Sequence, residues 1–308
     1  MNSKILVATE KPFAGVAVKQ IREICEDNGH ILVLLEKYEE QAELIQAVSA
    51  AEALIVRSDK ITEDVISHAA KLQIIVRAGA GYDNIDLNAA SQKGIIVMNT
   101  PGQNSNAVAE LALGMMIYMA RGKFNGKSGT ELKDKKLGIH AYGYVGKNVA
   151  RIAHGFGMEV MAYDPFVTSE IMINDGVQPA ESAEALYKNC DYVSLHLPSI
   201  PETQKFVDYE LLMKMKKGST LVNTARKEVV CEDSIMKALS EREDLKYVSD
   251  IAPDNAEELM SKFPDRCYFT PKKMGAQTKE ANINAGVAAI RQIVAYFKTG
   301  DTTFQVNK

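Results

Sequence analysis

The stretch from residue 137 to residue 164 constrains the fold more than any other part of the sequence. It contains a short apolar run, a turn segment at 141–146, a helical stretch, and a second apolar run that ends at Asp164. Compared with the fingerprint G-x-G-x-x-G, the turn segment has the pattern A-x-G-x-x-G, with Ala141 in the first place. This order of strand, turn, helix, strand and carboxylate is typical of a doubly wound sheet that binds a dinucleotide.

Each residue of this unit has a physical role in dinucleotide binding. Because Gly143 has no Cβ atom, the backbone can approach a pyrophosphate there, and Gly146 lets the helix pack close to the strand. The pyrophosphate is expected at the N-terminus of the helix that starts near Tyr144. Asp164 can accept hydrogen bonds from both ribose hydroxyls and repels a 2′-phosphate, which favours NAD over NADP.

Short apolar runs alternate with helical-period stretches along the whole chain. In the first half they lie at 5–9, 31–35, 53–57, 72–76 and 95–98; in the second half they lie at 137–141, 160–164, 192–195, 220–223, 247–250 and 268–270. Strands with helices between them indicate parallel sheets that are covered on both faces. The six later runs match a doubly wound dinucleotide-binding sheet, so we expect an α/β fold.

Two long helices and one loop complete the expected organisation. Residues 104–121 are apolar on more than one face, which is typical of a helix buried on several sides, between domains or in a subunit interface. The stretch 121–136 is polar and rich in Gly and Lys, and it is the best candidate for a domain boundary. The last helix has apolar residues at helical spacing over 283–297, and Gly300 closes it.

Composition excludes several classes of protein. The 308 residues are 46% hydrophobic and 25% charged, an average globular composition that excludes disorder, collagen-like repeats and coiled coil. A net charge of −4 without a basic block indicates a poor binder of nucleic acid or membrane. The four cysteines are far apart, which predicts neither a metal site nor disulfides. With no signal-peptide layout, a cytoplasmic location is expected.

Eight segments of the chain resemble the D-isomer-specific 2-hydroxyacid dehydrogenase family. They follow the family order at 56–58, 76–84, 99–102, 129–132, 141–146, 194–198, 222–226 and 275–280. The resemblance implies two Rossmann-like domains with parallel sheets, one flavodoxin-like and one doubly wound and dinucleotide-binding. Residues 1–98 and 277–308 would form the substrate-binding domain, and residues 99–276 the NAD-binding Rossmann domain, with the active site in the cleft.

The resemblance also implies an activity. It favours reversible, NAD-dependent oxidation of D-3-phosphoglycerate to 3-phosphohydroxypyruvate, the first step of serine biosynthesis, by a cytoplasmic homodimer that binds neither nucleic acid nor membrane. Because the printed chain stops at residue 308, we expect no serine-binding domain of the kind that longer relatives carry at the C-terminus. Two alternatives stay open: a glyoxylate or hydroxypyruvate reductase of the same family, and a non-catalytic NAD(H)-sensing interaction protein.

The expected catalytic residues depart from the family pattern. Arg226 matches the catalytic arginine, whose planar guanidinium can hold a carboxylate and a carbonyl with parallel hydrogen bonds. The family's acid–base pair is a His shortly after a Pro, together with a Glu. Here the loop 271–275 is one residue longer, and alignment on Gly275 puts Lys273 in the His position. Where the Glu would fall, the chain has Asn255, and the sequence leaves open whether Asp254 or Glu257 replaces it.

The joint loss of the His and the Glu is chemically consistent. A carboxylate beside a lysine would raise a pKa that is already near ~10.4 and spoil the lysine as a base. To act near neutral pH, Lys273 needs a pKa lowered by roughly two to three units, by desolvation and by its cationic neighbours Lys272 and Arg226. We hypothesise that Lys273 is the general acid–base. Alternatively, Lys273 holds the substrate phosphate while water or Lys272 moves the proton, or catalysis is lost.

Other site residues are expected in both domains. The loop at Gly79 and Ala80 can turn N–H groups toward the substrate carboxylate. Arg57, next to Ser58, is the candidate for the phosphate, and Lys123 and Lys127 could add positive charge. The resemblance assigns the remaining contacts to the cofactor: Ala80, Tyr144, Val145, Leu197, Pro198, Thr224, Ala225, Gly275, and Asp250 at the carboxamide. His196 is expected to be structural, while Lys227 and Glu228 replace the Gly-Gly often found after the arginine.

Overall fold

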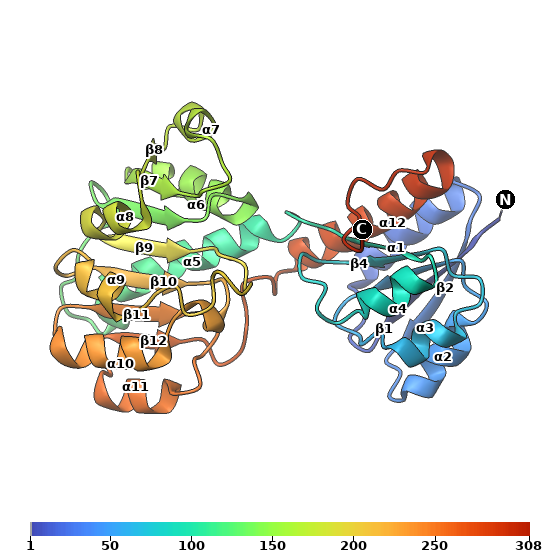
Figure 1. Cartoon of the computed structure of the whole chain (residues 1–308), viewed down its shortest axis with the longest axis horizontal. Helices are drawn as coiled ribbons and strands as arrows, with labels where there is room; N and C mark the ends of the chain where they lie inside the picture. Colours follow the sequence, from blue (N-terminus) through green and yellow to red (C-terminus); the bar gives the residue numbers. More distant parts are fainter. Residues whose placement is uncertain (1) are drawn as a thin grey trace. The chain divides into compact units, whose positions relative to one another are not determined.

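A computed structural model of the chain describes residues 2–308. These residues form two compact units, one of residues up to 104 together with 278–308, and the other of residues 105–277. Both crossings lie slightly C-terminal to the expected ones at 98/99 and 276/277. Figure 1 shows the chain coloured along its sequence, with the blue N-terminal part and the red C-terminal helix in the same unit.

The first unit is built on a five-stranded parallel sheet. Its strands are β1 (Lys4–Thr9), β2 (Ile31–Glu36), β3 (Ala53–Val56), β4 (Ile74–Arg77) and β5 (Ile96–Asn99). They lie in the order β2-β1-β3-β4-β5, which is the flavodoxin-like order. All five expected strands are confirmed, with ends that differ by one or two residues.

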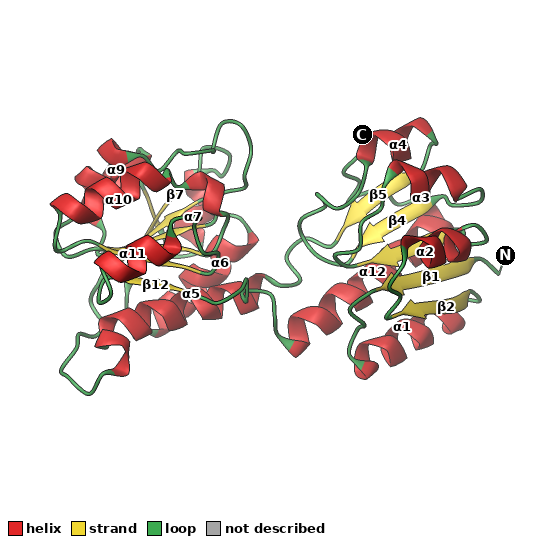
Figure 2. Cartoon of the chain, turned by 90° about the horizontal axis from the view of Figure 1, so that it is seen from below, coloured by secondary structure: helices red, strands yellow, loops and turns green. Residues whose placement is uncertain are grey.

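Helices cover both faces of this sheet (Figure 2). They are α1 (Gly15–Asp27), α2 (Gln41–Val48), α3 (Glu63–His68), α4 (Leu87–Gln92) and α12 (Lys279–Thr299). Helices α2, α3 and α4 pack on the face that includes Leu6 and Leu54, while α1 and α12 pack on the face that includes Ile5 and Ile55. Alternate strand residues therefore point to opposite layers, as in any pleated sheet. As expected, Gly300 ends α12 with a left-handed φ of 71°.

The second unit is built on a seven-stranded parallel sheet. Its strands are β6 (Lys136–His140), β7 (Glu159–Tyr163), β8 (Gln178–Pro179), β9 (Tyr192–Leu195), β10 (Thr220–Asn223), β11 (Lys246–Ser249) and β12 (Cys267–Phe269). The order is β12-β11-β10-β9-β6-β7-β8. The six expected strands are present. Strand β8 was not predicted, because its two residues, Gln178 and Pro179, do not form an apolar run. The strand that follows β6 in the chain lies on one side of it, toward β8, and the strand that follows β9 lies on the other side, toward β12. The topological switch point of the sheet therefore lies between β6 and β9.

The helices of the second unit also form two layers. They are α5 (Ser105–Ala120), α6 (Tyr144–Gly155), α7 (Ser169–Asn174), α8 (Ala183–Asn189), α9 (Tyr209–Lys214), α10 (Glu232–Glu241) and α11 (Ala256–Lys262), with 3-10 turns η1 (Gly122–Phe124) and η2 (Lys227–Val229). As expected, α5 is buried on several sides, where Ala112 and Met116 share a core cluster with Val149 of α6 and Val222 of the sheet. No helix within residues 2–308 is long and apolar enough to cross a membrane.

The expectation that the polar stretch 121–136 marks a domain boundary is wrong. This stretch lies inside the second unit, because it folds back onto the end of α5. The Thr130 N–H donates to the Ala120 carbonyl oxygen at 2.8 Å, and a Cβ at Gly129 would lie 2.3 Å from the same oxygen. The boundary instead follows β5, just before α5 begins.

Candidate functional site

The residues that the sequence analysis assigns to the cofactor gather at one edge of the second sheet. In a parallel sheet all carboxyl ends of strands lie on the same edge, which is where ligands of open α/β sheets bind. The turn 141–146 follows β6, Asp164 follows β7, Leu197 and Pro198 follow β9, Thr224 to Arg226 follow β10, Asp250 follows β11, and the loop with Lys273 follows β12. These residues therefore lie along the same edge because each of them follows a strand of one parallel sheet.

The turn between β6 and α6 has the geometry that the fingerprint requires. Helix α6 starts at Tyr144, with Gly143 as its N-cap. A Cβ on Gly146 would lie 2.5 Å from the Ala141 carbonyl oxygen, so this glycine lets the helix approach the strand, whereas a Cβ on Gly143 would meet nothing within 4 Å. Ala141 has a φ of 77°, in the left-handed region that favours glycine. The alanine in the first place of the fingerprint therefore has a backbone conformation in which glycine is more common.

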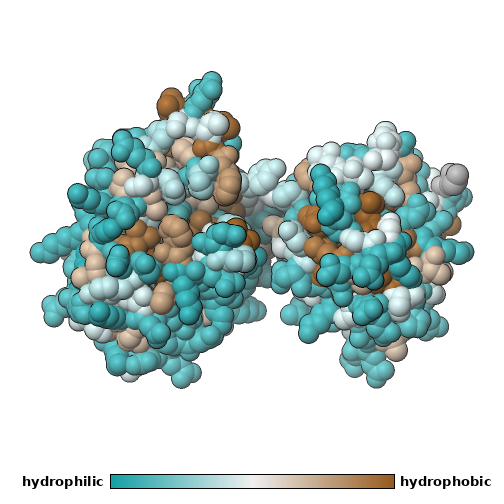
Figure 3. Space-filling model, in the orientation of Figure 1, coloured by the Kyte–Doolittle hydropathy of each residue, from teal (hydrophilic) through white to brown (hydrophobic). Residues whose placement is uncertain are grey.

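Asp164 is held over this turn by two backbone N–H groups. Tyr142 N donates to its Oδ2 at 2.7 Å and Phe166 N donates to its Oδ1 at 2.8 Å. A carboxylate has about four acceptor positions, so two stay available for ribose hydroxyls. Tyr144 in the turn and Phe166 after β7 expose 61% and 91% of their surface, whereas hydrophilic residues predominate on the face that Figure 3 shows. A fixed carboxylate with acceptor positions left, at the carboxyl edge of a parallel sheet, is a candidate ligand group.

Residues after β9 and β10 complete this edge. The Leu197 side chain is part of the core, so only its backbone can face a cofactor, while Pro198 is exposed. Thr224 and Ala225 are buried, and the Thr224 Oγ1 has no hydrogen-bond partner among residues 2–308. A buried hydroxyl without a partner is costly unless a ligand supplies one.

Arg226 stands on a short segment that Asn223 stabilises. The Asn223 Oδ1 accepts the Ala225 N–H at 2.9 Å, and its Nδ2 donates to the Arg226 carbonyl at 2.9 Å. The half-buried Arg226 side chain donates to the Ala225 carbonyl through one nitrogen, which leaves most of its five N–H groups for other partners. Sequence reasoning did not single out Asn223; the signal was a polar residue at the end of an apolar strand.

The two residues after Arg226 have backbone conformations that residues with side chains adopt without strain. Lys227 and Glu228 begin the turn η2, and neither belongs to the positive-φ residues of the described chain. The Lys227 ammonium pairs with Asp254, which raises the pKa of this lysine. Because the Asp254 carboxylate is already paired with Lys227, the structure does not favour Asp254 as a replacement for the family Glu. It does not favour Asn255 or Glu257 either. Asn255 donates to the Glu232 carbonyl at 3.3 Å, and Glu257 is an exposed residue of the first turn of α11.

The loop after β12 carries Lys273 as an exposed residue. Asp250, which is buried at the end of β11, accepts hydrogen bonds from Met274 N at 2.7 Å and from Gly275 N at 2.8 Å. None of the five histidines lies in this loop. The structure thus puts a lysine on the same sheet edge as Arg226 and ties the backbone that follows this lysine to β11.

At this edge His140 is buried and His196 is partly buried, and both have polar partners. His196 lies 3.0 Å from the Ser194 hydroxyl, in line with a structural role, and His140 lies 3.1 Å from the Tyr187 hydroxyl. Burial lowers the pKa of His140 to about 4. Burial, together with the nearby His140, lowers the pKa of His196 to about 3. Both imidazoles are therefore neutral in the folded protein at neutral pH.

These shifts predict that acid destabilises the protein before its carboxylates protonate. A histidine whose pKa falls from ~6.5 to about 4 on folding stabilises the fold above pH ~6.5, and this contribution is lost as the pH falls. For His140 alone we expect a loss of about 2 kcal/mol between pH 7 and pH 5. Urea unfolding of wild type and His140→Gln at both pH values measures it. The pH difference should shrink by about that amount in the variant. Equal losses in wild type and His140→Gln would contradict the prediction.

The candidates in the first unit lie at the carboxyl edge of the first sheet. Arg57 follows β3, but its guanidinium already donates to the Lys11 carbonyl at 2.9 Å and to Asn282 Oδ1 at 2.5 Å. It also lies over the Phe13 ring at 5.3 Å, and burial lowers its pKa. Ser58 next to it is exposed. Arg57 thus joins the β1–α1 loop to α12, and only part of its donor set stays available for a phosphate.

The loop at Gly79 follows β4 with its carbonyl groups turned toward the segment 99–100. Gly79 has a φ of 152°, and a Cβ there would lie 1.4 Å from the Arg77 guanidinium. The Gly79 carbonyl accepts the Thr100 N–H at 2.9 Å, and the Ala80 carbonyl accepts the Asn99 amide at 2.6 Å. In a trans peptide the N–H points opposite to the C=O. The N–H groups of residues 80 and 81 therefore point away from the segment 99–100.

Lys123 does not add charge to the expected substrate site. Its ammonium donates to the backbone carbonyls of Pro264 and Cys267. Cys267 begins β12, so Lys123 lies at the amino edge of the sheet, opposite to the ligand edge. Left-handed φ angles at Lys123 and Phe124 direct the loop there. Lys127 is exposed further along the same loop.

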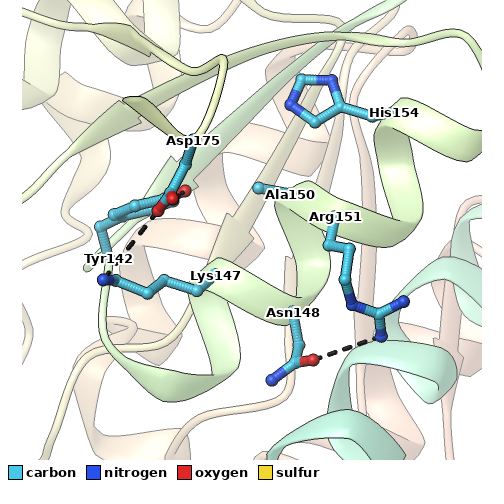
Figure 4. A pocket seen from close by; sticks show the side chains of 7 residues that line it. All are labelled: Tyr142, Lys147, Asn148, Ala150, Arg151, His154 and Asp175. Atoms are coloured by element: carbon cyan, nitrogen blue, oxygen red, sulfur yellow. Dashed lines mark hydrogen bonds and ion pairs between the residues drawn. The ribbon is translucent and has the colours of Figure 1, made fainter. Parts of the chain in front are cut away.

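Two surface cavities within residues 2–308 are lined by residues that the sequence analysis did not assign to a site. One of about 460 Å³ is lined by α6 and the residues beside it (Figure 4): Tyr142, Lys147, Asn148, Ala150, Arg151, His154 and Asp175. Asp175 accepts the Tyr142 hydroxyl at 3.1 Å and lies 3.9 Å from the Lys147 ammonium. The other, of about 310 Å³, lies between α12 and the segment after β5. Over residues 2–308 no cluster of His, Cys, Asp and Glu could hold a metal ion.

Comparison with known proteins points to one family. Residues 107–271 match the family described as D-isomer specific 2-hydroxyacid dehydrogenase, NAD binding domain. The structure is similar to that of NAD⁺-bound 3-phosphoglycerate dehydrogenase from Entamoeba histolytica, with a TM-score of 0.89, 49% sequence identity, and coverage of 100% of this chain and 99% of that one.

Curated relatives carry two different names. D-3-phosphoglycerate dehydrogenase of Homo sapiens is 36% identical over 301 residues, which are 93% of this chain and 56% of that protein. The chain therefore spans about half the length of such relatives. Hydroxypyruvate reductase of Thermotoga maritima is 34% identical over 286 residues, which are 86% of this chain and 91% of that protein.

Proposed function

The chain belongs to the D-isomer-specific 2-hydroxyacid dehydrogenase family, and we propose that it oxidises D-3-phosphoglycerate reversibly to 3-phosphohydroxypyruvate with NAD as the hydride acceptor. The observation that carries this proposal is the arrangement of the second unit. A fingerprint turn, a fixed Asp164 and an Arg226 stabilised by Asn223 all lie at one sheet edge. Residues 105–277 would bind the cofactor, and the remaining unit would bind the substrate.

The residues at this edge fit NAD. The open space at Gly143 admits the pyrophosphate to the N–H groups of Tyr144 and Val145, which have no intrahelical acceptor because they begin α6. Asp164 has acceptor positions left for the ribose hydroxyls, and the unpartnered Thr224 hydroxyl can bond near the nicotinamide. When bound, NAD supplies the hydride acceptor for C2 of the substrate.

The chain offers hydrogen-bond donors for the carboxylate, the C2 oxygen and the phosphate of the substrate. Arg226 would orient the carboxylate and polarise the C2 oxygen, because a guanidinium offers parallel N–H groups to two oxygens. The N–H groups of Ala80 and Gly81 would hold the carboxylate, and the remaining donors of Arg57 would reach the phosphate. Lys273 would take the proton from the C2 hydroxyl during oxidation and return it during reduction.

The experiment that tests this proposal measures NADH oxidation by the purified chain with three oxo acids. We expect rapid turnover with 3-phosphohydroxypyruvate and a much lower kcat/KM with hydroxypyruvate and glyoxylate, because a phosphate adds charge-assisted hydrogen bonds of about 1.5 to 3 kcal/mol each. Higher kcat/KM with hydroxypyruvate would instead favour the reductase alternative, which the Thermotoga maritima relative supports. NADH binding without any turnover would identify a sensor.

We also propose that the chain works in the cytoplasm as a homodimer. The support for association is the η1 loop, where Phe124 exposes 67% of its surface on a left-handed backbone and its ring lies 5.3 Å from that of Tyr118. Aromatic residues are enriched in protein–protein interfaces. Light scattering on the purified protein measures the mass directly.

A further inference from the structure

Asp250 forms several hydrogen bonds to neighbouring residues of the chain, in addition to any contact that it makes with a cofactor. Asp250 is 1% exposed, and its carboxylate accepts hydrogen bonds from Met274 N at 2.7 Å and Gly275 N at 2.8 Å. The Thr270 hydroxyl, which has one proton, lies 2.6 Å from the Asp250 carbonyl oxygen and 3.0 Å from its Oδ1, so it donates mainly to the carbonyl. Backbone N–H groups therefore occupy two of the roughly four acceptor positions of the carboxylate.

These three bonds hold both ends of the segment that carries Lys273. Thr270 directly precedes the exposed residues 271–273, and Met274 and Gly275 directly follow them. A Cβ on Gly275 would lie 3.0 Å from Asp250 Oδ2, so any other residue would require a shift of a few tenths of an ångström here. An exposed loop of this kind would otherwise sample many conformations, because little of it is packed.

The same network continues to Arg226. The Asp250 N–H donates to the Asn223 carbonyl at 2.9 Å, and the Asn223 side chain bonds to the Ala225 N–H and the Arg226 carbonyl. The segments that carry Arg226 and Lys273 are therefore connected through two buried polar residues on neighbouring strands. Short buried hydrogen bonds of this type fix geometry, because breaking one leaves a buried group unsatisfied.

We propose that Asp250 is a positioning residue for the reaction, which holds the Lys273 loop in register with Arg226 rather than serving mainly as a cofactor contact. This inference rests on the proposed function. Acid–base catalysis requires the lysine nitrogen within hydrogen-bond reach of the substrate hydroxyl. A displacement of about 1 Å by a change outside the chemistry can cost on the order of 100-fold in rate.

The test is Asp250→Asn. An amide has one acceptor oxygen, so its NH₂ group would face a backbone N–H that must donate, and the loop would detach. We expect kcat to fall on the order of 100-fold, while the Kd for NADH, measured by fluorescence titration, stays within about threefold of wild type. Asp265→Asn, an exposed carboxylate before β12, is the matched control.

Thr270→Val keeps the proposal testable if Asp250→Asn does not fold. It removes the hydroxyl that bonds to the Asp250 carbonyl and Oδ1 and leaves the carboxylate intact, and we expect a loss in kcat of about tenfold with unchanged NADH affinity. A kcat near wild type in both variants overturns the inference, and so does a loss of NADH affinity with kcat at saturation unchanged, which would identify a carboxamide contact. If wild type turns over none of the oxo acids, the proposed function fails instead.

Discussion

Replacing Lys273 with methionine is expected to abolish turnover of 3-phosphohydroxypyruvate while NADH binding stays at the wild-type level. Methionine keeps a long flexible side chain but can neither hold nor release a proton. General acid–base groups contribute about 10²- to 10⁴-fold to rates, so kcat should fall by at least that much. The hydrogen bonds that attach this loop to Asp250 come from the backbone of Met274 and Gly275, so the substitution leaves them in place.

The matched variant is Lys272→Met, on the adjacent exposed residue of the same loop. Steady-state rates and fluorescence titrations with NADH are measured for both variants. If Lys273 is the acid–base, Lys272→Met lowers the rate only modestly through the loss of a nearby charge. Near-normal turnover by Lys273→Met rejects the assignment, and loss of activity in Lys272→Met alone transfers the role to that lysine.

Replacing Gly146 with alanine is expected to damage both the fold of the second unit and cofactor binding. The new Cβ would lie 2.5 Å from the Ala141 carbonyl oxygen and 3.0 Å from Ile139 Cγ2. Because a backbone atom cannot move aside cheaply, α6 must shift away from β6. Overpacking of this kind typically costs about 1–3 kcal/mol, and urea unfolding measures it. We expect the Kd for NADH to rise by about tenfold or more, which corresponds to about 1.4 kcal/mol of binding free energy.

Gly143→Ala is the contrasting variant of the same turn. Here the Cβ enters open space and the φ of −83° suits alanine, so the free energy of unfolding should change by less than about 1 kcal/mol. NADH affinity should nevertheless fall by about tenfold or more, since the methyl group would occupy the space of the pyrophosphate. Wild-type affinity in Gly143→Ala would show that the pyrophosphate does not approach this glycine.

Much of the fold could be predicted because its signals are local. The eleven apolar runs alternate with helical stretches, and each forms a strand within one or two residues of its expected ends. The strand β8 has no such run, so its pairing with β7 depends on the neighbour rather than on its own residues. The loop 121–136 has a solvent-like composition, yet the Ala120 carbonyl and the Lys123 ammonium attach it to the second unit.

The candidate site was predictable to a smaller extent. The motif around Gly143 and Gly146 indicated the turn, and the resemblance indicated Arg226 and the altered loop at Lys273. Neither could show that Asn223 and Asp250 connect these two segments, since hydrogen bonds between residues more than twenty positions apart follow from strand order. For the same reason the sequence did not show that Arg57 is partly engaged by Asn282.

The sequence by itself determined the α/β class, the position of the dinucleotide turn and the residue types available for chemistry, because periodicity and turn preferences act over a few neighbouring residues. Only the tertiary structure decided how those residues are used. It puts Ala141 in a left-handed conformation, commits Lys123 to the amino edge of the sheet, and assigns two of the Asp250 acceptor positions to the backbone that follows Lys273. These outcomes depend on which buried polar groups meet after the strands have paired, and each such group must then find a partner.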